Sequence, residues 1–171
     1  MLKDPYALVI PDGTEVIRNS QYEETDYERV FIPKSVSQIE NYAFDGCKNL
    51  KEVVIEEGSK LKIIGKDSFR NCNSLTKMTF PEGLEKIGFY SFWETGLETI
   101  EFPVSLRTIA QGAFNGCKSL KAVKFNEGLE VLGTNEYPEN KGKRWFGVFE
   151  KSTLEKVELP SILRRIEYNA F

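Results

Sequence analysis

The sequence predicts a single elongated domain in which short parallel strands stack in a right-handed coil, mostly β and irregular with little α-helix. Three observations predict this solenoid. A Phe recurs at near-constant intervals, a short apolar strand ending in Pro follows it, and a second apolar pair precedes the next Phe. One such unit cannot bury its apolar side chains alone, so consecutive units must stack around one continuous core.

The Phe spacing sets the length of each coil. The intervals are 25, 23, 22, 35 and 22 residues between Phe44, Phe69, Phe92, Phe114, Phe149 and Phe171. All but the fourth interval fall within the roughly 20 to 29 residues of leucine-rich repeats. The long interval predicts an insertion of about twelve residues, at about 134–145, at one corner of one coil.

Each copy predicts a strand, a turn and a second apolar pair. In one copy the strand runs through Leu75 and Phe80 to Pro81, and the pair is Leu84 and Ile87. A proline ends a strand because it lacks the backbone donor and has a fixed φ. Five of the seven prolines occupy this place: Pro11, Pro33, Pro81, Pro103 and Pro160.

The sequence predicts one continuous domain, with a degenerate first repeat at 1–26 and leucine-rich repeats at 27–171. Residues 10–17 align with residues 80–87, which puts Tyr22 in the place of the recurring Phe. Terminal repeats are usually atypical, and this one should shield the first edge of the stack. Because Phe171 is a core landmark with no polar capping segment after it, we expect a fragment of a longer protein.

Composition argues against several functions. The 171 residues include no histidine, which removes Ser-His-Asp and Cys-His nucleophiles and His-containing zinc sites. None of the 26 acidic residues stands in a catalytic motif, so we expect no enzyme, no catalytic residue and no cofactor. The net charge of −3 argues against nucleic acid. No apolar run is long enough for membrane insertion, and no secretory signal opens the chain.

Three cysteines each follow a core Phe by three residues: Cys47, Cys72 and Cys117. Other copies hold Thr or Ser at this place, so we expect a buried column of small side chains. A disulfide between Cys47 and Cys72 stays open, because neighbouring coils are about 4.8 Å apart and disulfide Cα atoms about 4.4 to 6.8 Å. A metal site is the remote third alternative, and we expect no metal-binding residue.

The runs IENYAF, IAQGAF and IEYNAF at 39–44, 109–114 and 166–171, the first two followed by a small residue, Cys and Leu, resemble the BspA-like leucine-rich repeat family. The resemblance covers essentially the whole chain. It departs at the insertion, at Trp93 with the shortened turn 94–96, and in the weak first copy. It implies a leucine-rich repeat solenoid and a cell-surface or secreted protein of adhesin type, whose partner is a host or matrix protein.

The strand pattern predicts which side chains face outward. The first, fourth and sixth strand positions should point inward and the second, third and fifth outward. In the carboxyl half the outward positions alternate in charge, as in Glu101, Lys124 and Glu158, and should neutralise one another. In the amino half they form an apolar patch with a charged rim, our candidate protein-binding residues: Tyr6, Val9, Phe31 and Val54, with Arg29, Glu52 and Lys77. Alternatively, the first copy folds over this patch or the patch contacts a cap.

A secondary candidate is the inserted loop with Lys141, Lys143, Arg144 and Trp145. The charged residues of this loop either face solvent or form a contact point for a partner. Trp145 and Phe146 either take part in that contact or fold inward where the chain rejoins the core. The leading function is a non-enzymatic protein-recognition module. The alternatives are a structural spacer within a larger protein and, more remotely, an unconventional carboxylate hydrolase.

Overall fold

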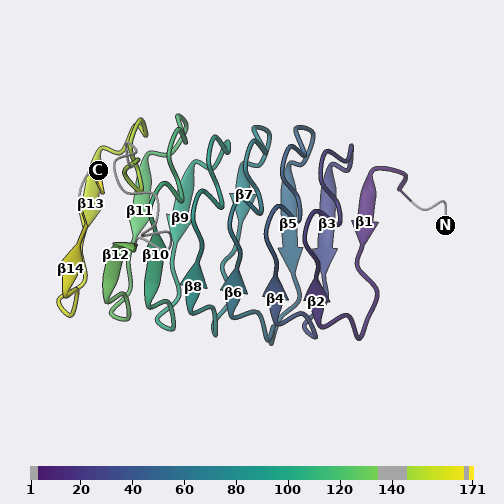
Figure 1. The fold of residues 1–171 in the computed structure, drawn as a ribbon, viewed down its shortest axis with the longest axis horizontal. Coiled ribbons are helices and arrows are strands. Elements are labelled where there is room, and N and C mark those ends of the chain that lie inside the picture. Colours follow the sequence, from purple (N-terminus) through teal and green to yellow (C-terminus); the bar gives the residue numbers. More distant parts are fainter. Residues whose placement is uncertain (1–3, 135–145, 168–169) are drawn as a thin grey trace.

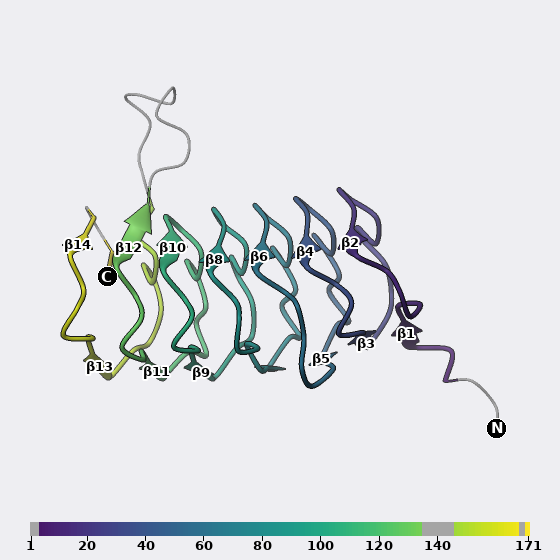
Figure 2. The same cartoon turned by 90° about the horizontal axis from the view of Figure 1, so that it is seen from below.

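The computed structural model describes residues 4–134, 146–167 and 170–171. The described chain winds into a row of stacked coils, with the two ends of the chain at opposite ends of the row (Figure 1). Turned by 90°, the same view separates two layers of strands that run along opposite sides of the row (Figure 2). The leucine-rich repeat solenoid predicted from the Phe spacing is therefore confirmed.

The front layer holds the strands that were predicted before each Pro. It consists of one four-stranded and one three-stranded sheet. The first contains β1 (Ala7–Val9), β3 (Arg29–Ile32), β5 (Glu52–Ile55) and β7 (Lys77–Met78). The second contains β9 (Thr99–Glu101), β11 (Ala122–Lys124) and β13 (Lys156–Glu158).

The back layer is a continuous sheet of seven described strands, built from the second apolar pair of each copy. We predicted that pair but not its strands. They are short because only the residues around one inward Ile or Leu are extended, as in Ile39 and Leu132. The strands are β2 (Val16–Ile17), β4 (Gln38–Ile39), β6 (Ile63–Ile64), β8 (Lys86–Ile87), β10 (Thr108–Ala110), β12 (Val131–Thr134) and β14 (Arg165–Ile166).

The recurring Phe residues form a ladder along the interior. Adjacent rings stack with centroid separations of 5.1 to 5.8 Å and with interplanar angles of at most 15°. Tyr22 opens the ladder by stacking on Phe44 at 5.4 Å, as the sequence alignment of the first copy predicts. Such aromatic contacts add about 0.5 to 1.5 kcal/mol each beyond the burial of area.

The front layer is split between β7 and β9, although the back layer is continuous there. The last inward position of the strand is Ile in the first three copies, for example Ile55, and Phe in the next three, beginning with Phe80. The Phe80 ring lies edge-on to the ladder ring of Phe92, with 5.5 Å between centroids and 81° between planes. The split therefore follows the first strand that ends in Phe rather than Ile.

Candidate functional site

Alternation along the front strands places one apolar set inside and a second apolar set outside. Val30 and Val53 point into the core and are buried. Their neighbours along the chain, Phe31 and Val54, point outward, and parallel pairing sets Val9 beside Phe31 and Phe31 beside Val54. Val9 is 67% exposed and Val54 36% exposed, while Phe31 is half-buried. The outward register predicted for these strands is therefore confirmed.

We call Tyr6, Val9, Phe31 and Val54 the amino-half patch. Tyr6 is 56% exposed at the start of β1. The predicted rim also falls into one row, because Arg29 pairs with Glu52 and Glu52 with Lys77 in the strand register. The structure thus places six of the seven predicted residues on one face of the first sheet, whereas Tyr6 precedes β1 and lines neither of the hollows described next.

Two hollows lie on either side of the ridge formed by Val9 and Phe31. The larger has a volume of about 560 Å³ and is lined by Asp4, Pro5, Ala7, Val9, Tyr27, Arg29 and Phe31. The smaller has a volume of about 250 Å³ and is lined by Val9, Ile10, Asp12, Phe31, Pro33, Val54 and Glu56. The surface of the patch is therefore uneven, with apolar side chains that protrude between two hollows.

Sequence reasoning missed Pro5 and Tyr27 as part of this surface. They occupy the first strand position, which we predicted to point inward and where Leu50 and Leu75 are fully buried. In the first two copies that prediction is wrong, since Pro5 is exposed and Tyr27 only half-buried, and both line the larger hollow. A Pro and a Tyr in place of Leu were the available signal, because a phenol hydroxyl is best placed where it reaches water.

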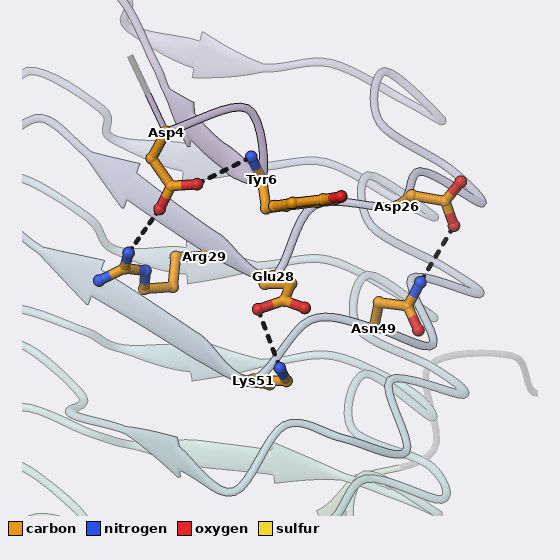
Figure 3. A network of polar contacts seen from close by, with 7 residues as sticks. All are labelled: Asp4, Tyr6, Asp26, Glu28, Arg29, Asn49 and Lys51. Atoms are coloured by element: carbon orange, nitrogen blue, oxygen red, sulfur yellow. Dashed lines mark hydrogen bonds and ion pairs between the residues drawn. The ribbon is translucent and has the colours of Figure 1, made fainter. Parts of the chain in front are cut away.

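A set of polar contacts holds Asp4, just before β1, onto the sheet (Figure 3). An Asp4 carboxylate oxygen accepts the Tyr6 backbone N–H at 3.0 Å, and the other oxygen pairs with Arg29 at 2.5 Å. These two contacts, the backbone hydrogen bond first, lower the pKa of Asp4. Beside them Lys51 pairs with Glu28 at 2.8 Å. The described part of the first copy therefore lies within the sheet and leaves Val9 exposed.

The carboxyl half of the front face carries paired charges. Lys124 forms an ion pair with Glu101, as the alternating pattern predicts. In the neighbouring row, no ion pair joins Lys121 to Glu98, both of which are among the described residues. The mutual neutralisation that we predicted is therefore present in the first pair but is not general.

The three cysteines are free and buried. Each thiol donates to the backbone carbonyl of the ladder residue one coil earlier: Cys47 to Tyr22 at 3.0 Å, Cys72 to Phe44 at 3.2 Å and Cys117 to Phe92 at 3.2 Å. The neighbouring Cys72 thiol, and then the Thr25 hydroxyl, lower the pKa of Cys47 to about 7, whereas burial raises the pKa of Cys117 to about 11. The favoured interpretation, a column of packed small side chains, agrees with these contacts.

A second aromatic group lies outside the ladder. Tyr90, Trp93 and Phe146 contact one another, with centroid separations of 4.4 Å for Tyr90–Trp93 and 5.1 Å for Trp93–Phe146. The Arg70 guanidinium lies 5.8 Å from the centroid of the Trp93 ring. Phe146 therefore packs against side chains of earlier coils. The loop candidates Lys141, Lys143, Arg144 and Trp145 lie outside the described residues, so their role stays a prediction.

Asp67 is the most deeply buried carboxylate among the described residues, with a side chain 2% exposed. Lys66 and Arg70 approach it to 3.7 Å each, but one carboxylate oxygen has no hydrogen-bond partner. Burial raises the pKa of Asp67 to about 6 despite these two cations. In residues 4–134, 146–167 and 170–171, no group of three or more His, Cys, Asp or Glu side chains is placed to hold a metal ion.

The described part of the chain also contains no helix that is long and apolar enough to cross a membrane. Fold and surface together define a class: a parallel β-solenoid repeat protein whose outer sheet carries its distinctive side chains. Residues 58–141 match the profile of the BspA type leucine rich repeat region, with six copies. Residues 58–141 therefore carry repeats of the BspA-type leucine-rich repeat family, as the sequence motifs indicate. The fold of this family is typically non-catalytic.

Solved structures of similar fold come from bacteria. A leucine rich cell surface protein from Faecalibacterium prausnitzii is 23% identical, with a TM-score of 0.74, over 97% of this chain and 44% of that one. A leucine-rich repeat protein from Bacteroides ovatus is 22% identical, with a TM-score of 0.72, over 95% and 48%. The leucine rich repeat protein of T. pallidum is 26% identical, with a TM-score of 0.53, over 74% and 73%.

The chain spans less than half the length of the first two of these structures. No curated protein matches the sequence.

Proposed function

We propose that this chain is a non-enzymatic protein-recognition module of a bacterial cell-surface or secreted protein, and that it contacts its partner through the amino-half patch. The observation that carries the proposal is the exposure of apolar side chains side by side on β1, β3 and β5, with Val9 67% and Val54 36% exposed. A contiguous apolar patch with a charged rim is typical of an interaction surface. Surface proteins of similar fold support the location.

An adhesin-type role, with a host or matrix protein as partner, is the specific form of this proposal. The two hollows beside Val9 and Phe31 offer concave sites for protruding side chains of a partner. Binding energy in protein interfaces is concentrated in a few buried apolar and aromatic anchors. We therefore expect Phe31 and Val54 to carry more of the affinity than the charged rim.

The test compares two Val-to-Lys substitutions that differ only in position. Val54 lies in the amino-half patch, whereas Val104 is 52% exposed in the turn after β9, outside the patch. Val54→Lys should weaken binding to an immobilised panel of extracellular-matrix proteins by about tenfold or more, whereas Val104→Lys should leave it unchanged. Phe31→Asp should act like Val54→Lys. Unchanged binding and unchanged self-association in both patch variants, with intact circular dichroism, would refute the proposal.

A spacer role has its own supporting observation in the carboxyl half. Lys124 and Glu101 pair with each other there, and exposed ion pairs of this kind are worth about 1 kcal/mol or less. This half of the face is suited to holding coils in register and needs no ligand. A chain that binds no matrix protein, but whose deletion from the parent protein shortens the reach of a neighbouring domain, would favour the spacer.

A further inference from the structure

We infer that a hollow at the shortened turn 94–96 binds a neutral sugar ring, at a site separate from the amino-half patch. The next Leu is the sixth residue after the ladder Phe in the coils of Phe69 and Phe114, but the fifth in the coil of Phe92 between them. The turns on both sides of the short turn therefore have one residue more. Between them lies a hollow of about 200 Å³, which we call the turn hollow, lined by Asn73, Glu94, Thr95, Gly96, Gly116, Lys118 and Ser119.

Two glycines keep the floor of the turn hollow free of side chains. A Cβ at Gly96 would lie 2.5 Å from the backbone oxygen of Asn73, so the short turn approaches the coil before it too closely for any side chain. Gly116 has a φ of +73°, and a Cβ there would lie 2.9 Å from Cγ of Glu94. The Asn73 amide also fixes the turn, because it donates to the Glu94 backbone carbonyl at 2.8 Å. The hollow is therefore built by the backbone of three consecutive described coils.

The lining of the turn hollow is polar throughout. None of its seven residues has an aliphatic or aromatic side chain, in contrast to the Val and Phe side chains that line the hollows of the amino-half patch. The Thr95 hydroxyl is already used, since it donates to the Phe92 carbonyl at 3.1 Å. The exposed side chains of Glu94, Lys118 and Ser119 form no hydrogen bond or ion pair with the described part of the chain. Because the hollow offers no apolar anchor of the kind on which protein interfaces depend, we do not expect a polypeptide there.

A neutral compound with several hydroxyl groups matches the free groups of the turn hollow. The Lys118 ammonium only donates hydrogen bonds and the Glu94 carboxylate only accepts them, whereas the Ser119 hydroxyl does both. Each hydroxyl of a sugar also does both, so neighbouring hydroxyls on one ring can pair with the two charged groups. A ligand with a net charge would be repelled by one of these groups. The volume is below the roughly 300 to 1,000 Å³ of sites for drug-sized molecules, which suits a single ring at the end of an oligosaccharide.

The test screens the fluorescently labelled chain on an array of oligosaccharides with neutral or sialylated ends, and then measures the bound ones by calorimetric titration. Glu94→Gln and Lys118→Met each remove one charged hydrogen-bonding group, and should weaken the binding of neutral oligosaccharides by about tenfold or more. Lys48 is the matched control, because it is exposed and, like Lys118, is the fourth residue after its ladder Phe, but it lines none of the hollows described above. Lys48→Met should leave this binding unchanged, and so should Val54→Lys in the amino-half patch.

Each result decides for or against the inference. Neutral oligosaccharides that bind, and that are weakened by both hollow variants but by neither control, support it. No bound oligosaccharide, binding confined to sialylated ends, or equal losses in Lys118→Met and Lys48→Met would overturn it. A loss of matrix-protein binding in Lys118→Met that persists after enzymatic removal of glycans would make the turn hollow a protein contact and overturn it as well. The amino-half patch is judged separately by Val54→Lys, and thermal unfolding confirms that both hollow variants fold.

Discussion

Replacing Phe92 by leucine tests how much the aromatic ladder contributes to stability. Phe92 is fully buried and stacks on Phe69 at 5.2 Å and on Phe114 at 5.1 Å, and Phe80 contacts it edge-on at 5.5 Å. At about 0.5 to 1.5 kcal/mol for each aromatic contact, the three contacts amount to about 1.5 to 4.5 kcal/mol. Leucine keeps most of the apolar burial, so the loss in the free energy of unfolding should fall within this range.

The matched control is Phe171→Leu at the other end of the described ladder. Phe171 is 52% exposed and, among the described residues, stacks on Phe149 alone, at 5.8 Å. Its replacement should cost about 1 kcal/mol or less. Urea unfolding followed by circular dichroism measures both losses, and the slope with denaturant reports whether the chain still unfolds as one unit. Equal losses at the two positions, or a loss below about 1 kcal/mol at Phe92, would refute the reasoning.

Three further predictions follow from burial and backbone geometry. The pKa of Asp67 is about 6 in the folded chain, against an ordinary value of 3.8. Between these two pH values the folded state binds more protons than the unfolded state. The free energy of unfolding should therefore fall as the pH rises from about 4 to about 6. Asp67→Asn should remove that fall when unfolding midpoints are measured across the window. A methyl group added at Gly128 would lie 1.7 Å from a backbone carbonyl oxygen, whereas Gly13 has open space, so thermal unfolding should show a far larger loss for Gly128→Ala than for Gly13→Ala. With a pKa of about 7 against about 11, Cys47 should be alkylated before Cys117 at neutral pH, as mass spectrometry of the labelled chain would show; the reverse order would contradict the difference in thiol environment.

The sequence predicts the repeat architecture well because one periodic pattern governs every coil. Each ladder Phe must be buried against the next coil, so its spacing alone gives the stacking and the front-strand register. The outward direction of Val9, Phe31 and Val54 follows from the same alternation. Tyr22 could be placed in the ladder although it is not a Phe, since the residues around it match the later copies.

Features that depend on contacts between coils were not predictable in this way. The inward position assigned to Pro5 and Tyr27 failed because the pattern derives from later copies, where Leu fills that place. The back strands were missed because two to four residues around one inward Ile or Leu give too short a run to identify a strand. Residue spacing also does not specify the split of the front layer between β7 and β9, since the strands on both sides of it follow the same repeat.

The interruption of the front layer has a mechanical consequence. Within residues 4–134 no backbone hydrogen bond joins β7 to β9, whereas β8 and β10 on the opposite side pair through Ile87 and Ile109. When the rod bends toward its back layer, the front layer must lengthen. At this coil no hydrogen bond between front strands has to stretch, so the rod should flex there more readily than elsewhere. We therefore expect the backbone to behave as two stiffer segments joined along the back layer. Because Val9, Phe31 and Val54 all lie on the first segment, a ligand held there leaves the angle between the segments free to adjust.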